Sequence, residues 1–222
     1  MIRTVFRALA ALRRAPAFHP RGVLLGGELR IDGTGSAAGT ALGPGPHRVL
    51  VRLSKGAGTP GKLPDLLGVA VRVEPDGARD AVDLLFTTST ARGALLAPAW
   101  GWRRATYSTL LPYDTAAGRV RLLLEPEPCE PDPPADPRAV AGAVRARSLR
   151  YRLVEAPLRA GARAAGTLVL TEERTGAVAF DPVLHQHPAL RPGPLLAGLR
   201  ARAYRGSRRG RGAAPTELAR TP

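Results

Sequence analysis

The sequence predicts an α+β protein built around an antiparallel β-barrel, with a short helix near each end of the chain. Between residues 22 and 171, short runs rich in Val and Leu alternate with breaks rich in Gly and Pro, which is typical of strands joined by turns. Helical spacing of apolar residues is clearest toward the two ends. Closing many short strands into a barrel removes exposed strand edges, so we favour a barrel over an open sheet.

The first predicted element is an amphipathic helix. Apolar residues recur every three or four positions near the N-terminus, with arginines between them: Ile2, Val5, Phe6, Leu9 and Leu12. Pro16 then ends the pattern, because proline cannot continue a helix interior. Strands follow at residues 23–31, 49–54, 69–73, 82–88, 120–124, 149–154 and 166–171.

The segments between these strands show other sequence patterns. Residues 91–111 show no clear period and are expected to form a loop with helical turns, and residues 125–137 are rich in Pro, Asp and Glu, which favours an exposed connector. Short helices are predicted at 138–147 and 195–208. With 222 residues and 44% hydrophobic content, residues 1–212 are expected to form a single domain, followed by a disordered tail at 213–222.

The charge is strongly basic but uneven in residue type. The formal net charge is +15, and Lys55 and Lys62 are the only lysines, so the excess is arginine. Arg, Ala, Gly and Pro share G+C-rich codons, so this excess does not by itself indicate nucleic-acid binding. No aromatic residues interleave the basic run at 205–211, so we expect no specific nucleic-acid partner.

Cysteine use and hydropathy indicate the compartment. Cys129 is the only cysteine, which excludes a disulfide framework within one chain and fits a reducing compartment. Arg7, Arg13 and Arg14 interrupt the N-terminal apolar stretch, so it does not read as a signal peptide. No apolar run approaches the roughly 20 residues of a membrane-spanning helix. We therefore expect a soluble, cytoplasmic protein without a transmembrane segment.

The strand around Arg52 has one apolar and one polar face. Alternation places Val49, Val51 and Leu53 on one face, and Arg52 and Ser54 on the other. If the polar face lines a pocket, Arg52 can bind a carboxylate or phosphate, and Ser54 can orient an imidazole by hydrogen bonding one ring nitrogen. The alternative is a half-exposed strand with a solvated arginine.

Two further motifs lie near the ends of the chain. His19 precedes a proline, and an imidazole titrating near neutrality can take a proton from a substrate and return it. Arg200, Tyr204 and Arg208 are spaced by four on the predicted C-terminal helix, so guanidinium groups flank the phenol. Adjacent cations favour the phenolate and so favour metal ligation. Taken singly, these motifs also fit an exposed histidine and a basic surface helix.

Taken together, the motifs resemble those of the catalase-like heme-binding superfamily, in a shortened form. His19-Pro-Arg-Gly22-x-x-x-x-Gly27-Glu28 resembles the distal-histidine motif of that family, and Arg52-Leu-Ser54 resembles its propionate arginine and histidine-orienting serine. The stretches Asp65-x-x-Gly68-x-Ala70-x-Arg72 and Asp83-Leu-Leu resemble the strands that follow. Arg200-x-x-x-Tyr204 with Arg211 resembles the proximal motif, so the resemblance runs over nearly the whole chain.

The resemblance implies a heme b cofactor and a role for each matching residue. His19 would be the distal acid and base, oriented by Ser54, and Tyr204 the axial ligand supported by Arg200. Arg52 and Arg211 would hold the propionates. A gapless alignment places Thr88 where catalases carry a distal asparagine, and a hydroxyl lacks the second polar group of an amide.

This set implies a heme-dependent hydroperoxidase acting on hydrogen peroxide or on organic and lipid hydroperoxides, with weak catalase activity. A homodimer is compatible with the sequence. Two alternatives remain open: a non-catalytic heme-binding protein that needs no His19, and a metal-dependent phosphodiesterase or hydrolase using His185 and His187, with Asp181 as the only close carboxylate.

Overall fold

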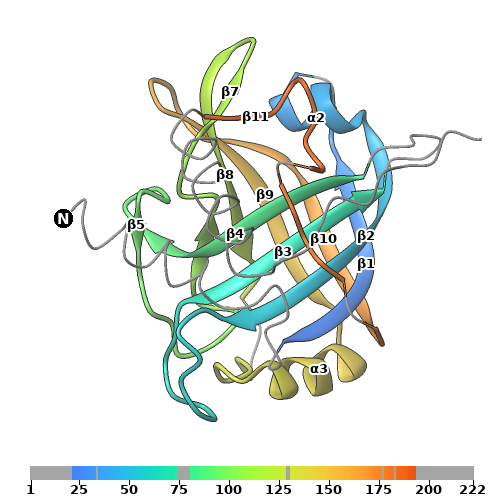
Figure 1. Ribbon diagram of the computed structural model, residues 1–222, viewed down its shortest axis with the longest axis vertical. Helices are drawn as coiled ribbons and strands as arrows, with labels where there is room; N and C mark the ends of the chain where they lie inside the picture. The colour runs from blue at the N-terminus through green and yellow to red at the C-terminus, as the bar shows by residue number, and fades with distance from the viewer. Residues whose placement is uncertain are drawn as a thin grey trace, which may run out of the picture.

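The computed structural model describes residues 22–33, 35–74, 81–128, 131–176, 178–182 and 184–193, and shows a closed antiparallel barrel (Figure 1). The N-terminal and C-terminal helices predicted from the sequence lie outside these residues. Within them, eight strands form the ring: β1 (Val23–Ile31), β2 (Gly45–Lys55), β3 (Leu67–Glu74), β4 (Val82–Thr90), β6 (Thr106–Ser108), β8 (Gly118–Pro126), β9 (Leu149–Pro157) and β10 (Arg163–Arg174).

The ring closes because β8 pairs with both β6 and β9. Around it the order is β8-β6-β4-β3-β2-β1-β10-β9, and every pairing is antiparallel. Three short strands extend the sheet: β5 (Leu95–Leu96) pairs with β4, while β7 (Tyr113–Thr115) joins β8 to β11 (Arg191–Pro192). The predicted barrel is confirmed, although the described residues are mostly strand rather than evenly mixed.

Alternate residues of the strands fill the interior of the barrel. Val49, Val51 and Leu53 of β2 and Leu67, Val69, Val71 and Val73 of β3 point inward and are buried, whereas the residues between them face outward. The largest fully buried side chains are Trp102, Tyr107 and Tyr151, and the two tyrosine rings meet edge to face with centroids 5.8 Å apart. The interior is therefore a packed core, as expected for eight strands.

A helix covers each end of the barrel (Figure 1). α3 (Pro137–Ala146) matches the predicted helix at 138–147; Asp136 caps it by accepting a hydrogen bond from the Arg138 N–H at 3.0 Å, and Val140 and Val144 are buried. α2 (Ala37–Leu42) was not predicted, because a helix of six residues, most of them small, shows no clear period in the sequence. No helix among the described residues is long and apolar enough to span a bilayer.

Segment 91–111 differs from its prediction. It contains the strands β5 and β6, and all of its residues are described and none lies in a helix. Tyr107 pairs with both Thr88 and Leu124, and this pairing makes the segment part of the barrel. This long-range pairing has no local signature in the sequence. The other predicted strands all lie within β1, β2, β3, β4, β8, β9 and β10.

Gly27 is required where β1 approaches β10. The register between these strands shifts between Gly26 and Gly27, and a Cβ at Gly27 would lie 2.0 Å from the Val169 carbonyl oxygen. We expect Gly27→Ala to lower the free energy of unfolding by about 3 kcal/mol, because backbone must move to make room. Chemical denaturation followed by circular dichroism measures this loss.

Gly142→Ala is the matched control. Gly142 lies within α3, where the nearest atom to a new Cβ is 4.0 Å away, so helix propensity predicts a gain of up to about 1 kcal/mol. Equal losses in the two variants would contradict the close approach of β1 and β10.

Candidate functional site

The outer face of β2, β3 and β4 brings the candidate polar residues together. Arg52 and Ser54 face outward from β2, as alternation predicts, because Val51 and Leu53, on either side of Arg52, are fully buried inside the barrel. The register then aligns Ser54 with Gly68 of β3, and Gly68 with Thr87 of β4. A row of small residues therefore crosses three neighbouring strands beside Arg52.

Thr88 lies on the other face of β4. Its side chain is fully buried, and its Oγ1 accepts a hydrogen bond from the Leu67 N–H at 3.1 Å, on the side where Leu84 and Phe86 join the core. The structure therefore does not bring Thr88 together with Arg52 and Ser54. The hydroxyl that shares their face is that of Thr87, one residue earlier.

Thr87 shares the outer face with Arg52 and Ser54, although the gapless alignment with the catalase motif pointed to Thr88. Its Oγ1 is buried and has no hydrogen-bond partner among the described residues, although a buried hydroxyl is normally satisfied. The alternation of Val82, Leu84 and Phe86 along β4 is visible in the sequence and places Thr87 outward. Gly68, its neighbour, keeps the row shallow: a Cβ there would lie 3.3 Å from the Ser54 Oγ.

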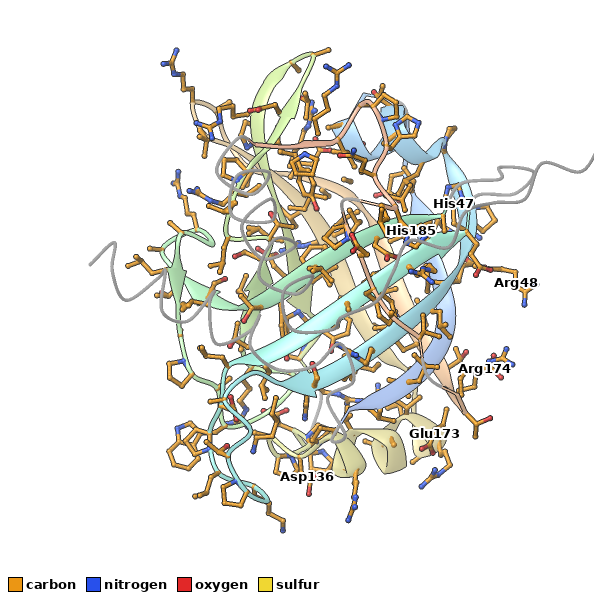
Figure 2. All side chains as sticks on the ribbon, in the orientation of Figure 1. His47, Arg48, Asp136, Glu173, Arg174 and His185 are labelled. Carbon is orange, nitrogen blue, oxygen red and sulfur yellow. The ribbon has the colours of Figure 1, made fainter. Side chains whose placement is uncertain are left out.

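Arg52 stands at the edge of a cavity of about 910 Å³. The cavity lies between the outer face of the sheet, the β2–β3 loop and α3, and Figure 2 shows Asp136, Glu173 and Arg174 at this end of the molecule. Desolvation lowers the pKa of Arg52 from its usual value, yet guanidinium remains charged at neutral pH. A partly buried cation beside a cavity favours an anionic ligand. Ser54 and Thr87 do not line this cavity themselves.

A buried ion pair lies in the next row along the same face. Arg72 Nε and Nη2 donate to the two carboxylate oxygens of Asp83 at 2.8 and 2.7 Å, and the Asp83 side chain is completely shielded from solvent. These hydrogen bonds, opposed by partial desolvation, raise the pKa of Arg72. Bidentate geometry of this kind is what makes a buried ion pair favourable.

Asp83 also fastens a later segment of the chain, residues 178–182 and 184–193, which we call the strap. The Asp181 N–H donates to Asp83 Oδ2 at 2.6 Å, and the Asp83 N–H donates to the His185 carbonyl at 2.9 Å. Arg72 Nη2 donates to the Ala179 carbonyl at 2.8 Å. Figure 1 shows the strap, in orange, crossing the outside of the sheet, and Figure 2 shows His185 there.

The hydrogen count assigns the tautomer of His185. Arg72 Nη2 carries two hydrogens, which the Asp83 carboxylate and the Ala179 carbonyl accept. His185 Nδ1, 2.9 Å from that nitrogen and 3.0 Å from Asp83 Oδ2, therefore carries a proton and donates it to Asp83. This is the fourth hydrogen bond that holds the strap.

Phe180 connects the strap to the candidate site. The centroid of its ring lies 5.7 Å from the guanidinium carbon of Arg52 and 5.3 Å from that of Arg72. Both distances are within the range of cation–π attraction. The position of the strap and the orientation of Arg52 are thereby coupled through one aromatic ring.

The two histidines of the hydrolase alternative engage different partners. His185 Nδ1 donates to Asp83, whereas His187 Nδ1 accepts a hydrogen bond from the Ala189 N–H at 3.1 Å. Asp181 Oδ1 accepts from the Leu184 N–H at 2.9 Å. Across the part of the chain that the structure describes, no three His, Cys, Asp or Glu side chains are grouped as metal ligands.

Four residues of the candidate site lie outside the described residues: His19, Arg200, Tyr204 and Arg211. Cys129 does too. For these residues the sequence remains the only basis for a role.

Comparison with known proteins supports the fold. No model of a known protein family matches the chain, and no curated protein matches it either. Among solved structures, the chain is similar to a fungal catalase, with a TM-score of 0.58 and 14% sequence identity over 90% of this chain. The match spans 60% of the length of that catalase. At this identity the similarity is one of fold, so the chain has a catalase-like barrel fold.

Asp83 gives a direct test of the strap. We expect Asp83→Asn to lower the free energy of unfolding by about 3 kcal/mol, because it leaves the partly buried Arg72 without its counter-charge. Hydrogen exchange at residues 178–182 should become faster at the same time, since the Asp181 N–H and the His185 imidazole both bond to this carboxylate.

Glu125→Gln is the control for this variant. It removes the charge of an exposed pair with Arg152, which is expected to contribute less than about 1 kcal/mol. If the strap exchanged at the same rate in Asp83→Asn as in the unmodified protein, Asp83 would not be what holds it.

Proposed function

We propose that the protein is a heme-dependent hydroperoxidase that acts on hydrogen peroxide or on larger organic hydroperoxides. The observation that carries this proposal is the Ser54–Gly68–Thr87 row beside Arg52, on the outer face of a catalase-like barrel. The row contains Ser54, which is proposed to orient His19, and a second hydroxyl, that of Thr87.

The described residues fit a heme. A flat macrocycle needs a shallow apolar surface, a cation for each propionate and few side chains in its plane. Gly68 and Ala70 provide the shallow surface, and Arg52 provides one cation beside a cavity. The buried and unpartnered hydroxyl of Thr87 is a polar group available to a ligand in this place. Arg211 is proposed to hold the second propionate.

When bound, the heme iron would supply the redox chemistry that cleaves the oxygen–oxygen bond. The protein would move the proton. His19 takes the proton of the hydroperoxide and returns it to the departing oxygen, and Ser54 orients the imidazole through one ring nitrogen. Tyr204 would hold the iron as the phenolate, which the guanidinium of Arg200 would stabilise.

Thr87 takes the distal role that the sequence comparison gave to Thr88. Its hydroxyl can donate one hydrogen bond to a bound hydroperoxide, whereas an asparagine amide both donates and accepts. A single polar group orients the substrate less completely. We therefore propose that dismutation of hydrogen peroxide is slow and that peroxidase turnover, which consumes two electrons from an external organic reductant, is the main activity.

We propose that larger substrates reach the row from the cavity beside Arg52, although Ser54 and Thr87 do not line that cavity. A volume of about 910 Å³ is in the range of sites that bind drug-sized molecules. Its lining combines apolar Leu24 and Val178 with cationic Arg52, which suits an organic hydroperoxide that carries an acidic group. A non-catalytic heme-binding protein is the second candidate, since Tyr204 and Arg52 could hold heme without any role for His19.

Tyr204 gives the first test. We expect hemin added to the purified protein to give the ferric Soret and charge-transfer bands of tyrosinate ligation, and Tyr204→Phe to lose them. The chain has four tyrosines, and burial raises the pKa of Tyr107, Tyr113 and Tyr151. None of these three can readily supply a phenolate, so the bands would report Tyr204.

Tyr113→Phe is the matched control and should keep the bands. Absence of stoichiometric hemin binding to the unmodified protein would reject the proposed function altogether.

His19 separates an enzyme from a carrier. We expect His19→Ala to bind hemin as tightly as the unmodified protein but to consume hydroperoxide about 100-fold more slowly, because the proton acceptor is lost. Stopped-flow rates with hydrogen peroxide and cumene hydroperoxide, beside a hemin titration, measure both quantities.

Two threonine variants complete this experiment. Thr87→Val should slow the reaction without weakening the fold, whereas Thr88→Val should lower stability because Leu67 loses its hydrogen bond. Unchanged rates in His19→Ala would favour the carrier.

A further inference from the structure

Two adjacent loops at one end of the barrel expose large apolar side chains. The β2–β3 loop, residues 56–66, extends past the end of the barrel (Figure 1) and is joined to the segment after β5 by paired hydrogen bonds between Asp65 and Ala99, at 3.1 and 2.9 Å. Trp100 is 71% exposed and Leu63 is 52% exposed. We call Leu63 and Trp100, with exposed Pro60 and Pro98, the apolar tip.

Two buried charges hold the first loop in shape. The ammonium group of Lys55 donates to the carbonyl oxygens of Gly61 and Leu63 at 3.0 and 2.8 Å. The Asp65 carboxylate accepts from the N–H groups of Ala57 and Thr59 at 2.7 and 2.8 Å. Lys55 and Asp65 are both buried, and burying charge is costly unless its hydrogen bonds are made. These hydrogen bonds fix the backbone of the loop and thereby hold Leu63 in its exposed position.

Trp100 is held in the same way from its backbone. Its carbonyl accepts a hydrogen bond from the Ala135 N–H at 2.8 Å, and the Trp102 N–H donates to the Pro133 carbonyl at 3.1 Å. The Trp102 ring is fully buried in the core. Because the backbone is fixed on both sides of Trp100, its indole is held outward while its neighbour anchors the segment.

Cations border the apolar tip. Lys62 is exposed, and no ion pair is recorded for it among the described residues. The Arg104 side chain is 71% exposed and lies 3.8 Å from Asp132, a weak contact in water. The carboxylates bonded to these loops are turned inward: Asp65 is buried, and Asp132 accepts from the Arg103 N–H at 2.8 Å. The loop that carries Leu63 therefore also presents an exposed cation, Lys62, and Arg104 follows Trp100 by four residues.

We propose that the apolar tip docks on an anionic membrane surface. Tryptophan prefers the boundary between headgroups and acyl chains, and a leucine beside it can enter the hydrocarbon. Each cation near an anionic bilayer adds attraction. A protein partner would require a broad, complementary surface of about 800 Å² per side, whereas a projecting loop with two large apolar side chains suits insertion. This proposal does not depend on heme or on the proposed activity.

The two tryptophans make the test specific. Trp102 is already buried, so a change in emission on binding reports Trp100. We expect vesicles of phosphatidylcholine mixed with phosphatidylglycerol to shift the emission to shorter wavelength, and brominated lipids to quench it. Vesicle sedimentation gives the affinity, measured at low and high salt and without added hemin.

Matched variants isolate the tip from the basic C-terminal tail, which could bind vesicles by charge alone. Trp100→Ala and Leu63→Ser should each weaken vesicle binding about tenfold, and Lys62→Ala about fivefold. Leu158→Ser removes an exposed leucine elsewhere on the surface and should change nothing. All four positions are exposed, so folding is preserved and is checked by circular dichroism.

Three results would overturn the proposal. The first is tryptophan emission that does not change at saturating vesicle. The second is equal vesicle affinity for Trp100→Ala and the unmodified protein, which would assign binding to the tail. The third is concentration-dependent dimerisation that Trp100→Ala abolishes in the absence of vesicles, which would make the tip a contact between two copies of the chain.

Discussion

The pairing of β8 with β9 closes the barrel, and this closure decides which side chains remain available for function. An eight-stranded ring leaves an interior just wide enough for its own side chains, and here Trp102, Tyr107 and Tyr151 fill it together with Val and Leu. The candidate polar residues lie instead on the outer face, where alternate residues of β2, β3 and β4 point, and these include Arg52, Ser54 and Thr87.

Buried charges hold several segments outside the barrel, in addition to the apolar packing of α2 and α3. Asp83 fastens the strap, Lys55 and Asp65 shape the β2–β3 loop, and Glu155 accepts from the Ala38 N–H of α2 at 2.8 Å while pairing with Arg163. Charged hydrogen bonds are directional, and a buried charge is costly without its partners. Such contacts fix one position for a loop, which matters beside a site where Phe180 meets Arg52 and at a tip that presents Trp100.

The long elements could be predicted because their signals are local. β1 matches the predicted strand at 23–31, and α3 matches the predicted helix, since Asp136 and Pro137 mark its start in the sequence. β5, β6, β7 and β11 were not predicted, because strands of two or three residues are too short to show a period in the sequence. Of the candidate site, Arg52 and Ser54 share an outer face as predicted, while Thr88 does not join them and Thr87 does.

The sequence by itself determined the strand-rich pattern, the two faces of the strand around Arg52, and the resemblance to the catalase-like superfamily, because alternation and motif spacing can be read along the chain. Only the tertiary structure decided that the ring closes, that Ser54, Gly68 and Thr87 form one row, and that Asp83 ties down a strap about 100 residues later. Strand register and ion pairing join residues that are distant in sequence. Both depend on which side chains become buried when the whole barrel forms, and not on local preference.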